Sequence, residues 1–211
     1  MGHRGNVRKG LGRCPPTNNL ESEDFLPNEI VSFVFPADSF AVIVILFGVS
    51  GAGKTTVGQL LAGELGWMFY EGDDFHSQAN IDKMHAGVPL TDEDRQPWLE
   101  SLRRLIERCL AAKENAVLTC SALKKSYRSY LRVGEEVKFV YLRGSYELIA
   151  DQLRQRHGHF MNPELLRSQF ATLEEPEAAE GVIAIQLGRS PRELVDEIKK
   201  KLGFDPSQTV E

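Results

Sequence analysis

One segment of the sequence has the residue types and the spacing needed to hold a phosphate group. Residues 48–55 read Gly-Val-Ser-Gly-Ala-Gly-Lys-Thr and match the pattern G-x-x-x-x-G-K-[ST] in full. Glycines let successive backbone N–H groups converge on phosphate oxygens, and the N-terminus of a following helix adds partial positive charge. Lys54 is expected to reach the β- and γ-phosphates as a catalytic group, and Thr55 to bind Mg²⁺. The residues expected to bind the nucleotide are Gly48, Ser50, Gly51, Ala52, Gly53, Lys54, Thr55 and Thr56.

An acidic turn follows the next predicted strand and reads Glu-Gly-Asp-Asp at 71–74. In open α/β sheets the carboxyl ends of the strands face the ligand crevice. A carboxylate there can accept the proton of an acceptor hydroxyl or organise a metal ion and its water molecules. Asp73 is the first choice as catalytic residue and as Mg²⁺ ligand, directly or through water, and Asp74 is the second. The alternative is an acidic turn that only faces solvent.

Two further segments have the composition of an acceptor-binding wall. Residues 80–98 are polar and too long for a simple crossover between strands, which is typical of an inserted binding element. Residues 121–128 are basic and follow the third predicted strand. Their cations could hold an acceptor carboxylate, preferably through a bidentate arginine such as Arg128. A solvated helix face is the alternative, and it suits Lys125 better than Arg128.

A basic segment with a glycine hinge, residues 154–160, lies between two predicted helices. Such a segment can close over a nucleotide and exclude water. Arg156 would then neutralise charge on the transferring group, as an arginine finger supplied in cis does. A solvated structural turn is the alternative. His157 and His159 have no metal partner nearby in the sequence and are interpreted as lid or surface residues.

The elements that must position these residues alternate between strand and helix from residue 40 onward. Strands are predicted at 41–47, 67–70, 116–120, 137–142 and 182–187, the first as an unbroken apolar run typical of a strand buried on both faces. Helices are predicted at 54–65, from 91, at about 123–131, around 146–153 and from 190. The helix from 91 has a capping box, Thr91 with Asp94, and the last helix has Ser190, Pro191 and Glu193 in capping register. This order predicts a five-stranded parallel sheet with helices on both faces.

Composition limits the class of protein. The chain has 211 residues, enough for one domain with a real core, with a net charge of −5 that argues against a broad nucleic-acid surface. Three scattered cysteines indicate a reducing compartment, and no apolar run is long enough to span a membrane. We expect residues 1–39 to form a disordered extension, 40–203 a kinase domain and 204–211 a tail. The basic start weakly resembles a transit peptide, and residues 29–35 could add an edge strand.

Several motifs together resemble the gluconokinase family over about residues 45–202. They are G-V-S-G-A-G-K-T at 48–55, E-G-D-D-F-H at 71–76, N-I-D-K-M at 80–84, G-V-P-L-T-D-E-D-R-Q-P-W-L at 87–99, C-S-A-L-K-K-S-Y-R at 120–128, R-H-G-H-F at 156–160 and Q-F-A-T-L-E-E-P at 169–176. They occur in the family's order and are far more specific than the phosphate loop alone.

The resemblance implies a P-loop fold of the nucleoside and shikimate kinase type with a mobile lid. It implies ATP- and Mg²⁺-dependent phosphorylation of D-gluconate at O6, feeding the pentose phosphate pathway, by a cytoplasmic dimer. The acceptor-side positions that match the family are Asp73, His76, Arg95, Lys124 and Arg128, and Arg156 matches its lid arginine.

The sequence departs from the family pattern at three places. Ala52 replaces a frequent serine, Ser77 stands where a proline is expected, and the stretch before residue 40 lies outside the pattern. None of these changes removes a catalytic group.

Two other functions stay open. One is a kinase of the same fold with another acceptor, such as shikimate or a nucleoside monophosphate. The other is a nucleotide-dependent switch that hydrolyses ATP without an acceptor, which would leave segments 71–98 and 120–128 unexplained.

Overall fold

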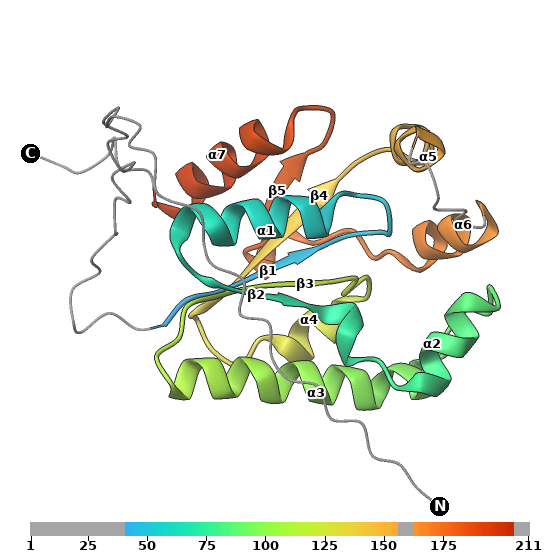
Figure 1. The fold of residues 1–211 in the computed structure, drawn as a ribbon, viewed down its shortest axis with the longest axis horizontal. Coiled ribbons are helices and arrows are strands. Elements are labelled where there is room, and N and C mark those ends of the chain that lie inside the picture. Colours follow the sequence, from blue (N-terminus) through green and yellow to red (C-terminus); the bar gives the residue numbers. More distant parts are fainter. Residues whose placement is uncertain (1–40, 156–162, 205–211) are drawn as a thin grey trace, which may run out of the picture. The chain divides into compact units, whose positions relative to one another are not determined.

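A five-stranded parallel sheet forms the centre of the fold. The computed structural model describes residues 41–155 and 163–204. The strands are β1 (Ile43–Phe47), β2 (Met68–Glu71), β3 (Ala116–Cys120), β4 (Val137–Arg143) and β5 (Ile183–Gln186). They lie in the order β2-β3-β1-β4-β5 (Figure 1), and every pairing is parallel. The predicted parallel sheet of five strands is confirmed.

One or two α-helices separate each strand from the next along the chain, and α7 follows β5. They are α1 (Lys54–Leu65), α2 (Gln78–His85), α3 (Asp92–Ala111), α4 (Lys125–Leu131), α5 (Tyr146–Gln155), α6 (Pro163–Thr172) and α7 (Pro191–Leu202), with short 3₁₀ turns η1 (Gly72–Phe75) and η2 (Ala178–Glu180). The predicted capping boxes are present at the starts of α3 and α7.

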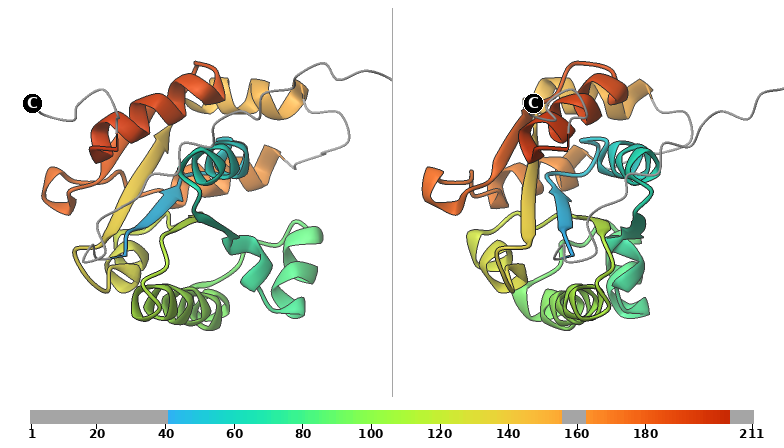
Figure 2. Two further views of the ribbon diagram at one scale, coloured as in Figure 1. Left: turned by 60° about the vertical axis from the view of Figure 1, so that its left-hand side comes forward. Right: turned by 90° about the vertical axis from the view of Figure 1, so that its left-hand side faces the viewer.

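Two apolar cores cover the two faces of the sheet. Alternate residues of β1 point to opposite faces, and all five are almost fully buried. Val44 and Leu46 belong to the core with α1 and α7, whereas Ile43, Ile45 and Phe47 belong to the core with α3 and α4. Figures 1 and 2 show α1 and α7 on one side of the sheet and α3 on the other. Helices on both faces are therefore confirmed.

Helix α2 is an element that the sequence analysis did not predict. Ser77, the residue at the expected proline position, caps this helix by accepting a hydrogen bond from the Asn80 N–H at 3.3 Å. The side-chain amide of Asn80 donates a hydrogen bond to the backbone carbonyl oxygen of Asp94 at 2.7 Å and fixes α2 to the start of α3. The departure at position 77 therefore starts a helix.

The carboxyl ends of the strands point toward the side on which α2, α5 and α6 project (Figure 1). This edge is where ligands bind in open α/β sheets. No described helix is both long and apolar enough to cross a bilayer. The predicted N-terminal extension, the edge strand at 29–35 and Arg156 lie outside the described residues.

Candidate active site

The phosphate-binding loop has the strand–loop–helix geometry that its sequence predicts, because it joins the buried β1 to α1. Gly48 has φ of +144°, and a Cβ there would lie 3.0 Å from the Leu142 carbonyl oxygen. Gly51 has φ of +84°, and a Cβ there would lie 2.7 Å from Leu153 Cγ on α5. Both positions therefore require glycine. Lys54, the first residue of α1, donates from Nζ to the Val49 carbonyl oxygen at 3.1 Å, so its ammonium lies over the loop.

Glu71 connects the phosphate loop to the sheet, although the sequence analysis chose only the aspartates that follow it. The Thr55 hydroxyl donates to Glu71 Oε2 at 2.6 Å, and the fully buried Thr119 on β3 donates to the other carboxylate oxygen. Glu71 is the last residue of β2 and pairs with Thr119 in register. That position at a strand end is the signal that could have identified it.

The acidic turn after β2 is held by contacts to two neighbouring elements. A Cβ at Gly72 would lie 2.2 Å from the Thr119 carbonyl oxygen, so only glycine fits against β3. The Gly72 carbonyl accepts a hydrogen bond from Trp98 Nε1 at 2.7 Å, and Trp98 is buried in α3. Asp73 is exposed and lines a cleft of about 820 Å³ beside the phosphate-binding loop, whereas Asp74 lines a smaller pocket. This geometry favours Asp73 over Asp74 for contact with an acceptor.

His76 lies flat against Trp98, with ring centroids 4.6 Å apart and planes at 10°. Its Nδ1 is buried and has no hydrogen-bond partner among the described residues. Burial lowers the pKa of His76, Arg95 lowers it further, and the nearby Asp73 partly opposes these effects. The imidazole is therefore mainly neutral at pH 7 and can donate or accept a hydrogen bond with a hydroxyl group of a phosphate acceptor.

The lowered pKa of His76 predicts a pH-dependent contribution to stability. Since the folded-state pKa lies below the ordinary value of 6.5, the unfolded chain binds this proton first as the pH falls. The free energy of unfolding should therefore decrease below pH 6.5, and His76→Gln should lack that part of the decrease. Urea unfolding of both proteins at about pH 5 and about pH 8 measures it. An equal difference between the two proteins at both pH values would contradict the prediction.

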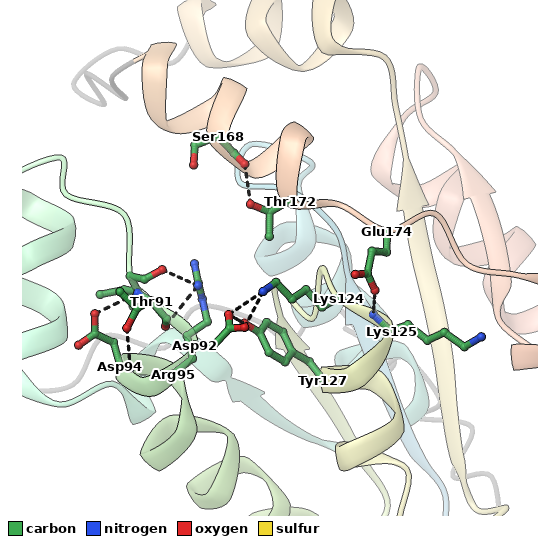
Figure 3. A network of polar contacts seen from close by, with 11 residues as sticks. Thr91, Asp92, Asp94, Arg95, Lys124, Lys125, Tyr127, Ser168, Thr172 and Glu174 are labelled. Atoms are coloured by element: carbon green, nitrogen blue, oxygen red, sulfur yellow. Dashed lines mark hydrogen bonds and ion pairs between the residues drawn. The ribbon is translucent and has the colours of Figure 1, made fainter.

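Arg95 reaches the cleft from the first turns of α3. Its Nη1 donates to the Leu90 carbonyl oxygen at 2.6 Å and more weakly to that of Thr91 at 3.4 Å. Thr91 and Asp94 cap the helix (Figure 3). Asp94 also pairs with Lys83 of α2 at 2.6 Å. The start of α3 thus fixes both the guanidinium and the segment before it that walls the cleft.

Lys124, another predicted acceptor residue, is engaged by a carboxylate. Its Nζ lies 2.7 and 2.6 Å from the two oxygens of Asp92, and the Tyr127 hydroxyl donates to the same carboxylate (Figure 3). This pairing raises the pKa of Lys124 and lowers that of Asp92. Lys124 itself is not among the residues that line the cleft, although the neighbouring Leu123 is.

Arg128 lies in a different environment from the one predicted. Its side chain is only 1% exposed and forms a bidentate pair with Glu180, at 2.7 Å from Nε and 2.9 Å from Nη2. Nη1 donates to the carbonyl oxygens of Ala122 and Leu123 at 3.3 and 3.1 Å. Arg128 does not line the cleft, and this arrangement gives no support to its predicted acceptor role. It fixes the backbone of the segment that bears Lys124.

The cleft brings together most of the predicted residues. It has a volume of about 820 Å³ and is walled by the phosphate loop, α2 with the segment to Leu90, and helices α5 and α6. Lys54, Thr55, Asp73, His76 and Arg95 all line it. So does Gln169 of α6, which the sequence analysis did not single out as a site residue. Arg156 cannot be placed, since it lies outside the described residues.

Comparisons with known proteins agree with this geometry. The shikimate kinase family model matches residues 50–202. A probable gluconokinase from Rattus norvegicus is 47% identical over 179 residues, covering 76% of this chain and 97% of the relative. The gluconokinase of Gluconobacter oxydans is 47% identical over 157 residues, covering 74% and 88%. The crystal structure of a gluconokinase from Sinorhizobium meliloti 1021 has a TM-score of 0.68 and 39% identity, covering 78% of this chain and 97% of that one. Since relatives this similar match along most of their length, the chain belongs to the gluconokinase family of P-loop kinases.

Proposed function

We propose that the protein transfers the γ-phosphate of ATP to O6 of D-gluconate, giving 6-phospho-D-gluconate and ADP. The observation that carries the proposal is that the phosphate loop, Asp73, His76 and Arg95 all line the same cleft. Relatives that bear the name gluconokinase, at up to 49% identity, support the choice of acceptor.

The reaction needs positioning and charge neutralisation more than covalent chemistry by the protein. The amides of the phosphate loop and Lys54 hold the β- and γ-phosphates, and Lys54 offsets negative charge on the transferring group. Asp73 orients the O6 hydroxyl and takes its proton as the new O–P bond forms. His76 and Arg95 bind other oxygens of the sugar acid. Lys124 releases Asp92 and helps to bind the carboxylate of the sugar acid instead.

The oxygen groups that line the cleft beside the phosphate loop fit a magnesium ion. The Thr55 hydroxyl and the Asp73 carboxylate, the latter directly or through water, are the hard oxygen donors that Mg²⁺ prefers. When bound, the ion neutralises phosphate charge. Glu71 holds the Thr55 hydroxyl in place for it.

Glu71→Gln is expected to raise the Mg²⁺ concentration needed for half-maximal activity by about 10–100-fold, because an outer-shell carboxylate orients the metal ligand. Titrating Mg²⁺ at fixed ATP measures this change. Glu107→Gln, on the surface of α3, is the control and should match the wild type. An unchanged Mg²⁺ requirement in Glu71→Gln would contradict the assigned role.

The lid and its arginine belong to the same proposal. Helices α5 and α6 flank residues 156–162, and Leu153 of α5 packs against Gly51 of the phosphate loop. Arg156 follows Leu153 by three positions in the sequence, and its proposed role is to neutralise charge on the transferring phosphoryl group. Replacing Arg156 with alanine should lower kcat more than it weakens ATP binding.

A homodimeric assembly and a cytoplasmic location are further parts of the proposal, supported by the family resemblance.

An acceptor panel tests the proposal. ADP release from Mg·ATP is measured with D-gluconate, other aldonates, glucose, shikimate, AMP and no acceptor. Stimulation by gluconate above all others is expected. Stimulation by shikimate, the acceptor named by the matching family model, would make shikimate the acceptor and leave the assignment of the phosphate site unchanged. Turnover that ignores every acceptor would favour the ATP-hydrolysing switch.

A further inference from the structure

Helix α6 makes a direct contact with the phosphate-binding loop. The Ser50 N–H, within that loop, donates to Oε1 of Gln169 at 2.6 Å across 119 residues of sequence. Both residues line the cleft in which the nucleotide phosphates belong. The contact therefore fixes one backbone amide of the loop before any ligand arrives.

The position of Gln169 is set by the packing of α6. Leu166, one turn earlier, is buried in the same core cluster as Val49 at the start of the loop. Beyond the end of α6, the Glu174 N–H donates to the Leu123 carbonyl oxygen at 2.9 Å, and the Glu174 carboxylate accepts from the Lys125 N–H at 2.6 Å (Figure 3). The buried core and the residues that follow the helix therefore hold α6, and with it Gln169, beside the phosphate loop.

The chemistry of the side chain suits this place. A backbone N–H needs an acceptor, and a carboxylate oxygen would satisfy it equally well. A carboxylate at this point of the cleft would also repel the phosphate groups. The glutamine amide accepts the hydrogen bond and carries no charge.

From these contacts we infer that Gln169 is a positioning residue for phosphoryl transfer: it holds Ser50 in the loop conformation that receives the nucleotide phosphates, and it keeps this bond in the nucleotide complex. The inference deepens the proposed function, on which it rests. Its test uses nucleotide binding alone and does not depend on the identity of the acceptor.

The test is calorimetric binding of Mg·ADP to the full chain without acceptor. Gln169→Leu keeps most of the side-chain volume and leaves the Ser50 N–H without its acceptor, so affinity should fall by between about two- and tenfold. Gln169→Glu keeps an acceptor and adds negative charge beside the phosphates. It should also bind Mg·ADP more weakly than the wild type, and its deficit should shrink as the salt concentration rises.

Arg167→Gln is the matched control, because Arg167 is an exposed residue of α6 that pairs with Glu164 at the surface. It should bind Mg·ADP like the wild type. If Gln169→Leu does not fold, Gln169→Glu alone decides the question.

Two results would overturn the inference. Tighter or unchanged Mg·ADP binding by Gln169→Leu would mean that Gln169 only occupies the place of a phosphate. Wild-type binding by Gln169→Glu at every salt concentration would mean that the side chain is not beside the phosphates in the complex. If the wild-type protein does not phosphorylate gluconate in the acceptor panel, the proposed function is wrong, and the Mg·ADP binding test of Gln169 is unaffected.

Discussion

Replacing Lys54 with methionine is expected to lower kcat by about two to three orders of magnitude while the protein stays folded. Lys54 begins α1 and its ammonium lies over the phosphate loop, in contact with the Val49 carbonyl oxygen. A preorganised cation at this position stabilises the negative charge that develops on the transferring phosphoryl group. In an open site, water would screen this interaction and weaken it. Methionine keeps the length of the side chain and removes only the charge and the hydrogen-bond donors.

Steady-state kinetics and thermal unfolding together check this expectation. Loss of the Nζ hydrogen bond to Val49 should cost no more than about 1.5 kcal/mol of stability, so an inactive variant should remain folded. Lys200→Met, at an exposed position of α7, is the control and should keep wild-type turnover. Near-normal turnover of Lys54→Met would contradict the assignment of residues 48–55 as the phosphate site.

Replacing Arg128 with methionine should lower the free energy of unfolding by about 3–5 kcal/mol, because it leaves the Glu180 carboxylate nearly buried without its cation. The Arg128 side chain is 1% exposed and the Glu180 side chain 9% exposed, and the two hydrogen bonds between them are 2.7 and 2.9 Å long. Arg128 also lowers the pKa of Glu180, so the pair's contribution is present above the ordinary value of 4.5 and is lost as the pH falls through the lowered value. Urea unfolding at neutral pH measures the difference.

The chain offers a matched control on the same helix. Lys125 pairs with Glu177 at 2.8 Å, but both side chains are about half exposed, so Lys125→Met should cost less than about 1 kcal/mol. Replacing Arg128 and Glu180 together with apolar residues should recover much of the lost stability, since no charge is then left unpaired. Unchanged stability of Arg128→Met, together with a strongly raised KM for the acceptor, would restore the acceptor role that the sequence predicted for Arg128.

What the sequence could predict follows from how local each signal is. The phosphate loop, β1 and the capping boxes of α3 and α7 depend on residues close together in the chain, and the structure has them where the pattern predicts. Helix α2 was not predicted, because its residues are largely polar and it is held by contacts to the start of α3.

Two residues whose surroundings the sequence did not predict, Arg128 and Gln169, have partners that are distant in the sequence. Arg128 has the residue type and context of an anion-binding arginine, and only the fold reveals Glu180, 52 residues away, as its partner. Gln169 likewise reaches Ser50 across 119 residues. By contrast, Asp73 lines the cleft, on the side that its position after the carboxyl end of a strand indicates, and its catalytic role stays a prediction.

A phosphorus NMR spectrum of the protein with Mg·ATP and D-gluconate tests the central claim most directly. We predict that the γ-phosphate signal of ATP is lost in step with the growth of one phosphomonoester signal, which matches authentic 6-phospho-D-gluconate, and that Lys54→Met shows neither change. Release of inorganic phosphate without a phosphomonoester, or an unchanged ATP spectrum with gluconate present, would contradict the claim that this cleft transfers a phosphoryl group to gluconate.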